Sequence, residues 1–312
     1  MKRYLPFVIL ALLAVVPLVG LNSYLMHILI LFVMWSVIGM SWNLLGGYCG
    51  QVSFGHAAFF GVGAYTAGIF YAKTGLSAWW GLPLSIVAVA LFALVIGFIV
   101  LRLRGPYFAL ATLAMGEVLR VTAENLTNLT GGDVGIMIRE RTWVEKIWYY
   151  YIILAVAAIT FYLVKIVVQS RLGYYFVAIR EDQDAAESLG INTTLYKTIA
   201  LSSSAVITGL AGAFYTNYMG YIDPKVVFAL HDISIITIMV VMVGGVATFW
   251  GPVIGSIIMI LMSEVIRSIP MLGSAHQTFF GMLLIIIIIF LPNGIAGDFK
   301  KLKRLIRTGR TT

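Results

Sequence analysis

The chain has 312 residues, of which 61% are hydrophobic and 11% are charged, whereas soluble domains average about 45–50% apolar and about 25% charged residues. This excludes a soluble globular fold, because no such fold buries so much apolar surface. The formal net charge of +8 does not indicate nucleic-acid binding, since six basic residues lie within the last thirteen positions. A basic segment after a membrane helix favours cytoplasmic retention and anionic lipid headgroups.

Long charge-free stretches predict a membrane protein built only from helices. Between Arg3 and Lys73 there is no Asp, Glu, Lys or Arg, and a helix that crosses a ~30 Å hydrocarbon core needs ~20 apolar residues. The first crossing is expected to be an uncleaved helix, because no A-x-A-like signal-peptide cleavage site follows it. We therefore predict one all-α polytopic domain over residues 1–312, with about ten crossings. They are expected near residues 5–21, 24–45, 56–72, 79–101, 106–125, 147–168, 198–219, 232–247, 253–269 and 278–292.

A glycine-rich segment over residues 43–65 follows the second crossing. Small residues let helices approach closely in lipid, and clustered glycines allow a helix to break where the freed backbone groups face protein or water. Gln51, Ser53 and His56 are then predicted to line a solute path. The alternative is a tight loop followed by a closely packed helix, with His56 a structural histidine.

The fifth crossing carries ionisable residues. If it begins near Pro106, Glu117 lies ~16 Å along the helix, near the bilayer midplane. Glu117 and Arg120 are spaced i, i+3, so they share a face and can pair. Intramembrane ionisable residues are rare and usually face a bundle interior or water. Two interpretations remain open: a polar lining of the translocation path, or a structural ion pair between helices.

Residues 169–197 form the most polar stretch of the chain and are predicted to be a cytoplasmic loop. Residues 183–189 are expected to form a short helix that stops at Gly190. Ala185, Ala186 and Leu189 should make a small apolar face with dense charge around it, which suits docking into a groove of another protein. The alternative is a solvated loop.

The orientation follows from the basic residues. An even number of crossings puts both termini on one side, and Lys and Arg gather in cytoplasmic loops. With the N-terminus inside, most of the 21 Lys and Arg residues lie on the cytoplasmic side. The tail over residues 298–312 contributes most to that balance, so both termini are predicted to be cytoplasmic.

Known catalytic and cofactor motifs are missing from the sequence. It contains no G-x-x-x-x-G-K-[ST] phosphate-binding loop, so ATP binding through such a loop is excluded. It also lacks H-E-x-x-H and G-x-S-x-G, and its single cysteine, Cys49, excludes an internal disulfide and C-x-x-C sites. We expect a transporter rather than an enzyme, with no metal or other cofactor. Its energy must come from a partner or an ion gradient, and in the second case Glu117, Arg120 and His56 would form an ion relay.

Several motifs together resemble the LivM-type permease subunits of branched-chain amino acid ABC importers. The resemblance covers nearly the whole chain, and its specificity lies in the order and spacing of the motifs. They are residues 50–59 (GQVSFGHAAF), 63–65 (GAY), 104–109 (RGPYFA), 116–117 (GE), 130–132 (TGG), 178–181 (AIRE), 185–186 (AA), 209–213 (GLAGA), 244–245 (GG), 251–255 (GPVIG) and 292–294 (PNG).

This resemblance implies a subunit of an ATP-driven importer in the cell inner membrane. The implied partners are a second homologous permease subunit, two cytoplasmic ATP-binding subunits and a periplasmic substrate-binding protein, besides membrane lipids. Related permeases handle urea or short amides, so the solute class stays open. The resemblance also implies an ATPase-coupling helix in the inside loop, formed by Arg180, Glu181, Ala185, Ala186, Glu187 and Gly190.

Overall fold

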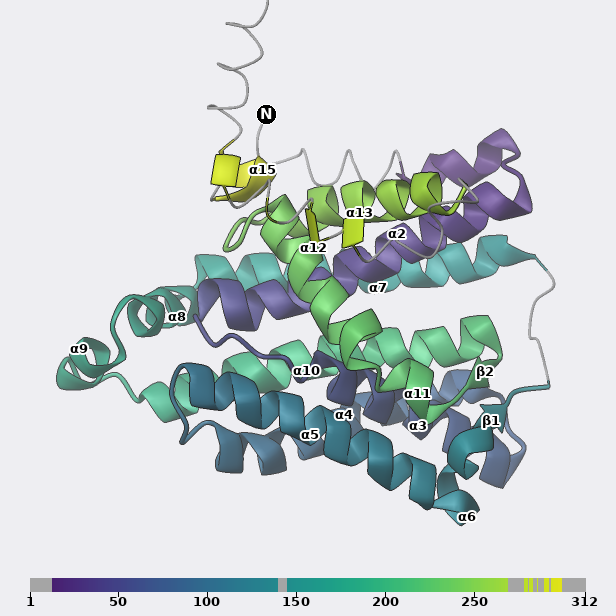
Figure 1. The fold of residues 1–312 in the computed structure, drawn as a ribbon, viewed down its shortest axis with the longest axis horizontal. Coiled ribbons are helices and arrows are strands. Elements are labelled where there is room, and N and C mark those ends of the chain that lie inside the picture. The colour runs from purple at the N-terminus through teal and green to yellow at the C-terminus, as the bar shows by residue number, and fades with distance from the viewer. Residues whose placement is uncertain are drawn as a thin grey trace, which may run out of the picture.

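A computed structural model describes residues 13–139, 145–268, 278–279, 281–282, 285, 289–291 and 293–298. In these residues the chain is almost wholly helical, which confirms the predicted all-α bundle (Figure 1). The longer helices are α2 (Ser23–Trp42), α3 (His56–Thr74), α4 (Gly81–Val100), α5 (Pro106–Asn125), α7 (Lys146–Gln169), α10 (Thr193–Met219), α12 (Ile236–Gly244) and α13 (Gly251–Arg267).

Shorter elements connect these helices. Two π-helices, η2 (Asn43–Tyr48) and η5 (Leu230–Ile235), extend α2 and precede α12. Two short strands, β1 (Ile136–Met137) and β2 (Tyr221–Ile222), pair antiparallel. The remaining elements are η1 (Val16–Val19), η3 (Ala78–Trp80), α6 (Thr127–Thr130), η4 (Gly132–Val134), α8 (Arg171–Glu181), α9 (Gln183–Ser188), α11 (Pro224–Val227) and α15 (Gly294–Gly297).

The eight predicted crossings from 24–45 to 253–269 each coincide with a helical segment. Five segments of the described chain are long and apolar enough to span a membrane. They are Ser23–Tyr48, Ala78–Val100, Lys146–Gln169, Thr193–Met219 and Pro224–Gly244. About half of the first predicted crossing, including residues 5–12, and about half of the tenth lie outside the described residues, as do residues 299–312 of the basic tail.

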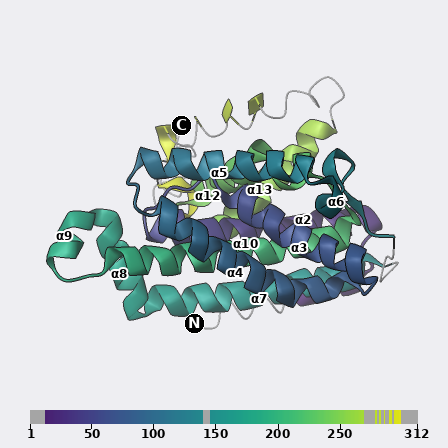
Figure 2. The same cartoon turned by 90° about the horizontal axis from the view of Figure 1, so that it is seen from below.

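Helix α10 is central to the bundle and packs against α3, α4 and α2 (Figure 2). The contact with α3 depends on glycines. A Cβ added to Gly63 would lie 2.0 Å from the carbonyl oxygen of Gly209, and one added to Gly212 would lie 2.0 Å from that of Phe60. Real side chains cannot approach so closely, so the expectation that small residues bring helices together is confirmed for this pair.

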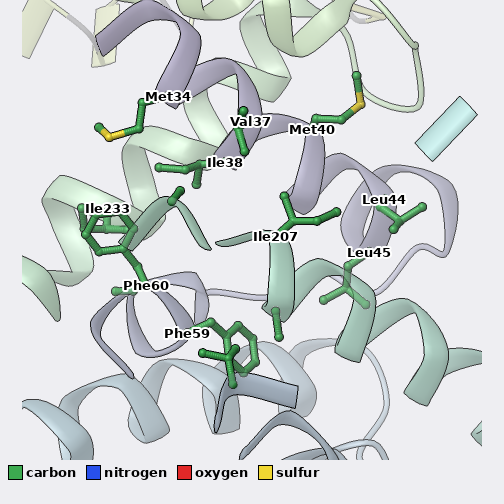
Figure 3. Packing of buried hydrophobic residues seen from close by; sticks show 14 of the residues in the cluster. Met34, Val37, Ile38, Met40, Leu44, Leu45, Phe59, Phe60, Ile207 and Ile233 are labelled. Atoms are coloured by element: carbon green, nitrogen blue, oxygen red, sulfur yellow. The ribbon is translucent and has the colours of Figure 1, made fainter. Parts of the chain in front are cut away.

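Apolar side chains fill the space between α2, α3 and α10. Figure 3 shows Phe59 and Phe60 from α3 near Ile207 of α10, with Ile38 from α2 above them. Hydroxyl pairs add hydrogen bonds inside this packing. Ser41 Oγ of α2 lies 2.7 Å from Thr208 Oγ1 of α10. Such interhelical bonds stabilise membrane bundles modestly, because the alternative is a polar group in hydrocarbon.

Candidate functional site

The glycine-rich segment is a broken helix. Helix α2 continues into η2, residues 49–55 are non-helical, and α3 begins at His56. The freed backbone groups find partners inside the protein: Trp42 Nε1 donates to the Ser53 carbonyl at 2.8 Å, and the Phe54 amide donates to Thr112 Oγ1 of α5 at 3.1 Å. The break therefore packs directly against α5, five residues before Glu117.

A second glycine-rich segment, residues 244–255, supports the break from the other side. Asn43 Oδ1 accepts a hydrogen bond from the Ala247 amide at 2.8 Å, and Asn43 Nδ2 donates to the Thr248 carbonyl at 2.9 Å. One asparagine side chain thus satisfies backbone groups about two hundred residues away. Sequence reasoning missed this role of Asn43, and its only signal was the position of a polar residue in an apolar helix.

The predicted path residues near the break have different environments. Gln51 is half-buried, whereas Ser53 and His56 are fully buried. His56 Nε2 lies 2.9 Å from Ser204 Oγ of α10, and its Nδ1 has no hydrogen-bond partner among the described residues. His56 is therefore inside this chain, between α3 and α10, and not on an open surface.

On α5 the predicted pair is present and belongs to a larger cluster. Arg120 forms an ion pair with Glu117 through two hydrogen bonds, and a second ion pair with Glu124, one turn further along. Pairing of Glu117 with Arg120 is therefore confirmed. Glu124 was missed, although its i, i+4 spacing from Arg120 was a usable signal. We call Glu117, Arg120 and Glu124 the α5 charged cluster.

This charged cluster runs from the outside of the described bundle inward, because the side chains of Arg120 and Glu124 are only 26% and 19% exposed. Only Phe108, Thr112, Gly116 and Ala123 of α5 are buried, while the side chain of Glu117 is 52% exposed. A charged side chain facing hydrocarbon is costly. The exposed side of α5 therefore requires protein or water next to it.

An apolar groove of about 580 Å³ lies along another side of α5, lined by Leu119, Thr122 and Ala123 of that helix. It runs between α3 and α5 and continues to α6, and its walls are mostly aliphatic and aromatic side chains, including Ile69, Leu119 and Phe228. Lys73, at the end of α3, lies at one edge. None of Gln51, Ser53, His56, Glu117 and Arg120 lines this groove, so the structure does not gather the predicted path residues into one cavity.

The inside loop contains more helix than expected. The predicted short helix is confirmed as α9, in which the Asp182 side chain accepts hydrogen bonds from the Asp184 and Ala185 amides, and Gly190 ends it with φ +83°. Helix α8 precedes it and was not predicted. Together α8 and α9 extend from one end of the bundle (Figure 1).

The predicted apolar face of α9 was to contain Ala185, Ala186 and Leu189, and this prediction is wrong for Ala186. Ala186 is buried, whereas Ala185 is exposed and Leu189 is 82% exposed. The reason is that a six-residue helix lying against α10 must turn one face inward, and Ala186 is on that face. The exposed apolar surface is therefore formed by Ala185 and Leu189.

Three side chains attach α9 to its surroundings. Lys197 of α10 is buried and donates a hydrogen bond to Gln183. Glu187 accepts hydrogen bonds from Thr193 Oγ1 at 2.5 Å and from Gln183 Nε2 at 2.8 Å. Those two donors hold the pKa of Glu187 below its usual range. Arg104, before α5, lies 2.6 Å from Asp184.

The family profile described as the permease component of the branched-chain amino acid transport system matches residues 24–290. The chain belongs to this permease family. Its predicted LivM-type membership is thereby confirmed. The high-affinity branched-chain amino acid transport permease LivM of Salmonella typhimurium is 27% identical over 288 residues, which cover 83% of this chain and 67% of that protein. LivM of Escherichia coli is 26% identical over the same shares.

One solved structure is also similar to the permease. The structure titled PsaBC from Streptococcus pneumoniae in complex with Fab aligns with 90% of this chain and 96% of that chain, at a TM-score of 0.46 and 16% identity. The relatives are permease subunits and not enzymes, and the permease is an integral inner-membrane protein. Among its described residues no group of three His, Cys, Asp or Glu could hold a metal ion.

Proposed function

We propose that this permease is the membrane-spanning subunit of an ATP-driven importer for branched-chain amino acids. A periplasmic binding protein delivers the solute, and two cytoplasmic ATP-binding subunits drive alternating access. The observation that carries the proposal is the α8–α9 projection, which presents exposed Ala185 and Leu189 between charged residues and is bonded back to the bundle.

Helix α9 is the proposed coupling helix. Arg180, Glu181, Ala185, Glu187 and Gly190 border or form its exposed surface. Short amphipathic helices suit grooves in partner proteins, and the ATP-binding subunit is the partner proposed here. This assignment places α8 and α9 in the cytoplasm, with both termini on that side.

The exposed side of α5 is proposed to face a second, homologous permease subunit, with the translocation path between the two subunits. Support comes from the α5 charged cluster, because its charges need protein or water rather than hydrocarbon. The apolar groove beside α5 suits a solute with an aliphatic side chain. Gln51, Ser53 and His56 would act behind this path by supporting the break that packs on α5.

The test is purification of a C-terminally tagged chain from native membranes in mild detergent. We expect a second permease and a P-loop ATPase to co-purify in near-equal amounts. Uptake of leucine, isoleucine or valine by the reconstituted complex should stop when ATP is depleted and should continue in the presence of an ionophore. An isolated chain whose uptake collapses with the ionophore would instead establish ion coupling, and uptake of urea or short amides alone would overturn the solute class.

A further inference from the structure

Arg104 connects the inside projection to α5. It lies in the short turn between α4 and α5, and its guanidinium meets two carboxylates of α9: Nη1 is 2.6 Å from Asp184 Oδ1, and Nη2 is 3.6 Å from Glu187 Oε2. Asp184 and Glu187 are three residues apart and so share one face of α9. In both overall views this turn lies at the end of the bundle from which α8 and α9 extend (Figures 1 and 2).

The link from Arg104 into α5 is short and conformationally restricted. Gly105 has φ +54°, which favours glycine, and Pro106 occupies the first turn of α5. The Gly105 carbonyl accepts hydrogen bonds from the Phe108 and Ala109 amides at 3.2 and 3.3 Å. Only Gly105 separates Arg104 from Pro106, the first residue of α5.

The projection has a second, separate connection to the bundle. Arg180, in the last turn of α8, donates from Nη1 to the Gly47 carbonyl at 3.3 Å. Its stem also covers Gly50, where an added Cβ would lie 2.7 Å from Arg180 Cγ. Arg180 thus attaches the projection to the break between α2 and α3, whereas Arg104 attaches it to α5.

We propose that Arg104 is a positioning residue that transmits movement of α9 to α5 and to the charged cluster that α5 carries. This inference rests on the proposed function, because it takes α9 as the coupling helix. Folding does not require the contact: the side chains of Arg104, Asp184 and Glu187 are 55%, 77% and 42% exposed, and exposed ion pairs add little stability. Its value is directional, since it joins α9 directly to the turn before α5, whereas the main helix contacts of α9 are with α8 and α10.

The experiment uses the reconstituted complex with its partner subunits. Arg104→Gln is compared with Arg102→Gln, which removes an equal charge from the same turn. Arg102 lies over the Phe98 ring of α4, 4.5 Å from its centroid, and so serves as the matched control. Uptake, ATP hydrolysis and the amount of bound ATP-binding subunit are measured for each variant.

We expect Arg104→Gln to keep the ATP-binding subunits bound and hydrolysis near the wild-type rate, while solute moved per ATP falls about tenfold, within the usual range of coupling between sites. Arg102→Gln should behave as wild type. Arg104→Asp should be impaired further, and combining it with Asp184→Arg should restore part of the lost uptake by reversing the pair.

Two results would overturn this inference and leave the proposed function intact. One is wild-type uptake per ATP in Arg104→Gln. The other is a loss of uptake that matches a loss of bound ATP-binding subunit, which would make Arg104 only a part of the docking surface. A wild-type complex without any ATP-dependent uptake would overturn the proposed function, and the inference would fall with it.

Discussion

Helices α4 and α5 are neighbours of equal length, with 20 residues each, yet their exposed sides differ in kind. The exposed side chains of α4 are all apolar, and Val95 and Phe98 are 62% and 70% exposed. On α5, Val118 is 63% exposed, but the acidic residue Glu117, which pairs with Arg120, is next to it. Exposure therefore has two meanings in this permease: α4 presents a surface that matches lipid, and α5 one that needs protein or water.

This difference indicates which side of the subunit needs a protein or water neighbour in the membrane. A charge at the centre of a membrane helix costs at least about 2.5–3.5 kcal/mol against hydrocarbon, and pairing within the α5 charged cluster offsets only part of that. Four predictions follow this contrast between α4 and α5.

The largest effect is expected from matched charge insertions. Leu91 of α4 and Val118 of α5 are 59% and 63% exposed and lie near the middle of their helices. Leu91→Arg should lower the inserted amount of protein strongly, since it opposes insertion by about 2.5–3.5 kcal/mol. Val118→Arg should insert nearly as well as wild type. Membrane fractionation and quantitative blotting measure both, and equal losses would remove the distinction between the two sides.

Removing the shared cation of the α5 charged cluster should have the second-largest effect. Arg120→Leu leaves the carboxylates of Glu117 and Glu124 two turns apart on the same side without their shared cation. We expect a loss of about 1–3 kcal/mol in unfolding free energy and loss of most uptake. Glu117→Gln keeps one hydrogen bond to Arg120 and should be milder. Thermal unfolding in detergent and uptake in liposomes measure the two effects, and if both variants match wild type the cluster has neither role.

A photoactivatable phenylalanine analogue distinguishes the neighbours of the two sides directly. At Val121 of α5, which is 42% exposed, it should form adducts mainly with a second permease subunit. At Leu94 of α4, which is 48% exposed, it should label lipid. Mass spectrometry of the adducts identifies the partners. Lipid adducts at both positions would leave the charged side of α5 without the proposed neighbour.

The smallest effect concerns pH at the α9 end of the bundle, where Arg104 in the turn before α5 contacts α9. Hydrogen bonds from Thr193 and Gln183 lower the pKa of Glu187. The stability that they add is therefore present above the unfolded-state pKa of about 4.3 and is lost as pH falls through the lower folded-state pKa. Amide exchange of α9, corrected for its intrinsic pH dependence, should rise slightly at low pH. Glu187→Gln should abolish that pH dependence, and its persistence would assign the effect to another group.

Local patterns predicted most helices correctly. Charge-free stretches indicated the crossings, the i, i+3 spacing indicated the Glu117–Arg120 pair, and Gly190 indicated the end of α9. Helix α8 was missed because its residues 171–181 are too polar for a crossing. The buried residues of α8 are Gly173, Phe176 and Ile179, and three positions at helical spacing are too few to predict a helix. The π-helices were missed because nothing in an apolar run distinguishes them from α-helix.

By itself, the sequence determined that this protein is an all-helical membrane permease and which residues carry charge inside it, because hydropathy and helical spacing depend on near neighbours. Only the tertiary structure decided that α5 turns Glu117 outward, that His56 is buried against Ser204, and that Arg104 reaches Asp184. Each of these depends on residues far apart in the chain. The direction in which a helix faces is set by the helices that cover it, and those contacts leave no periodic signal in the sequence of the helix itself.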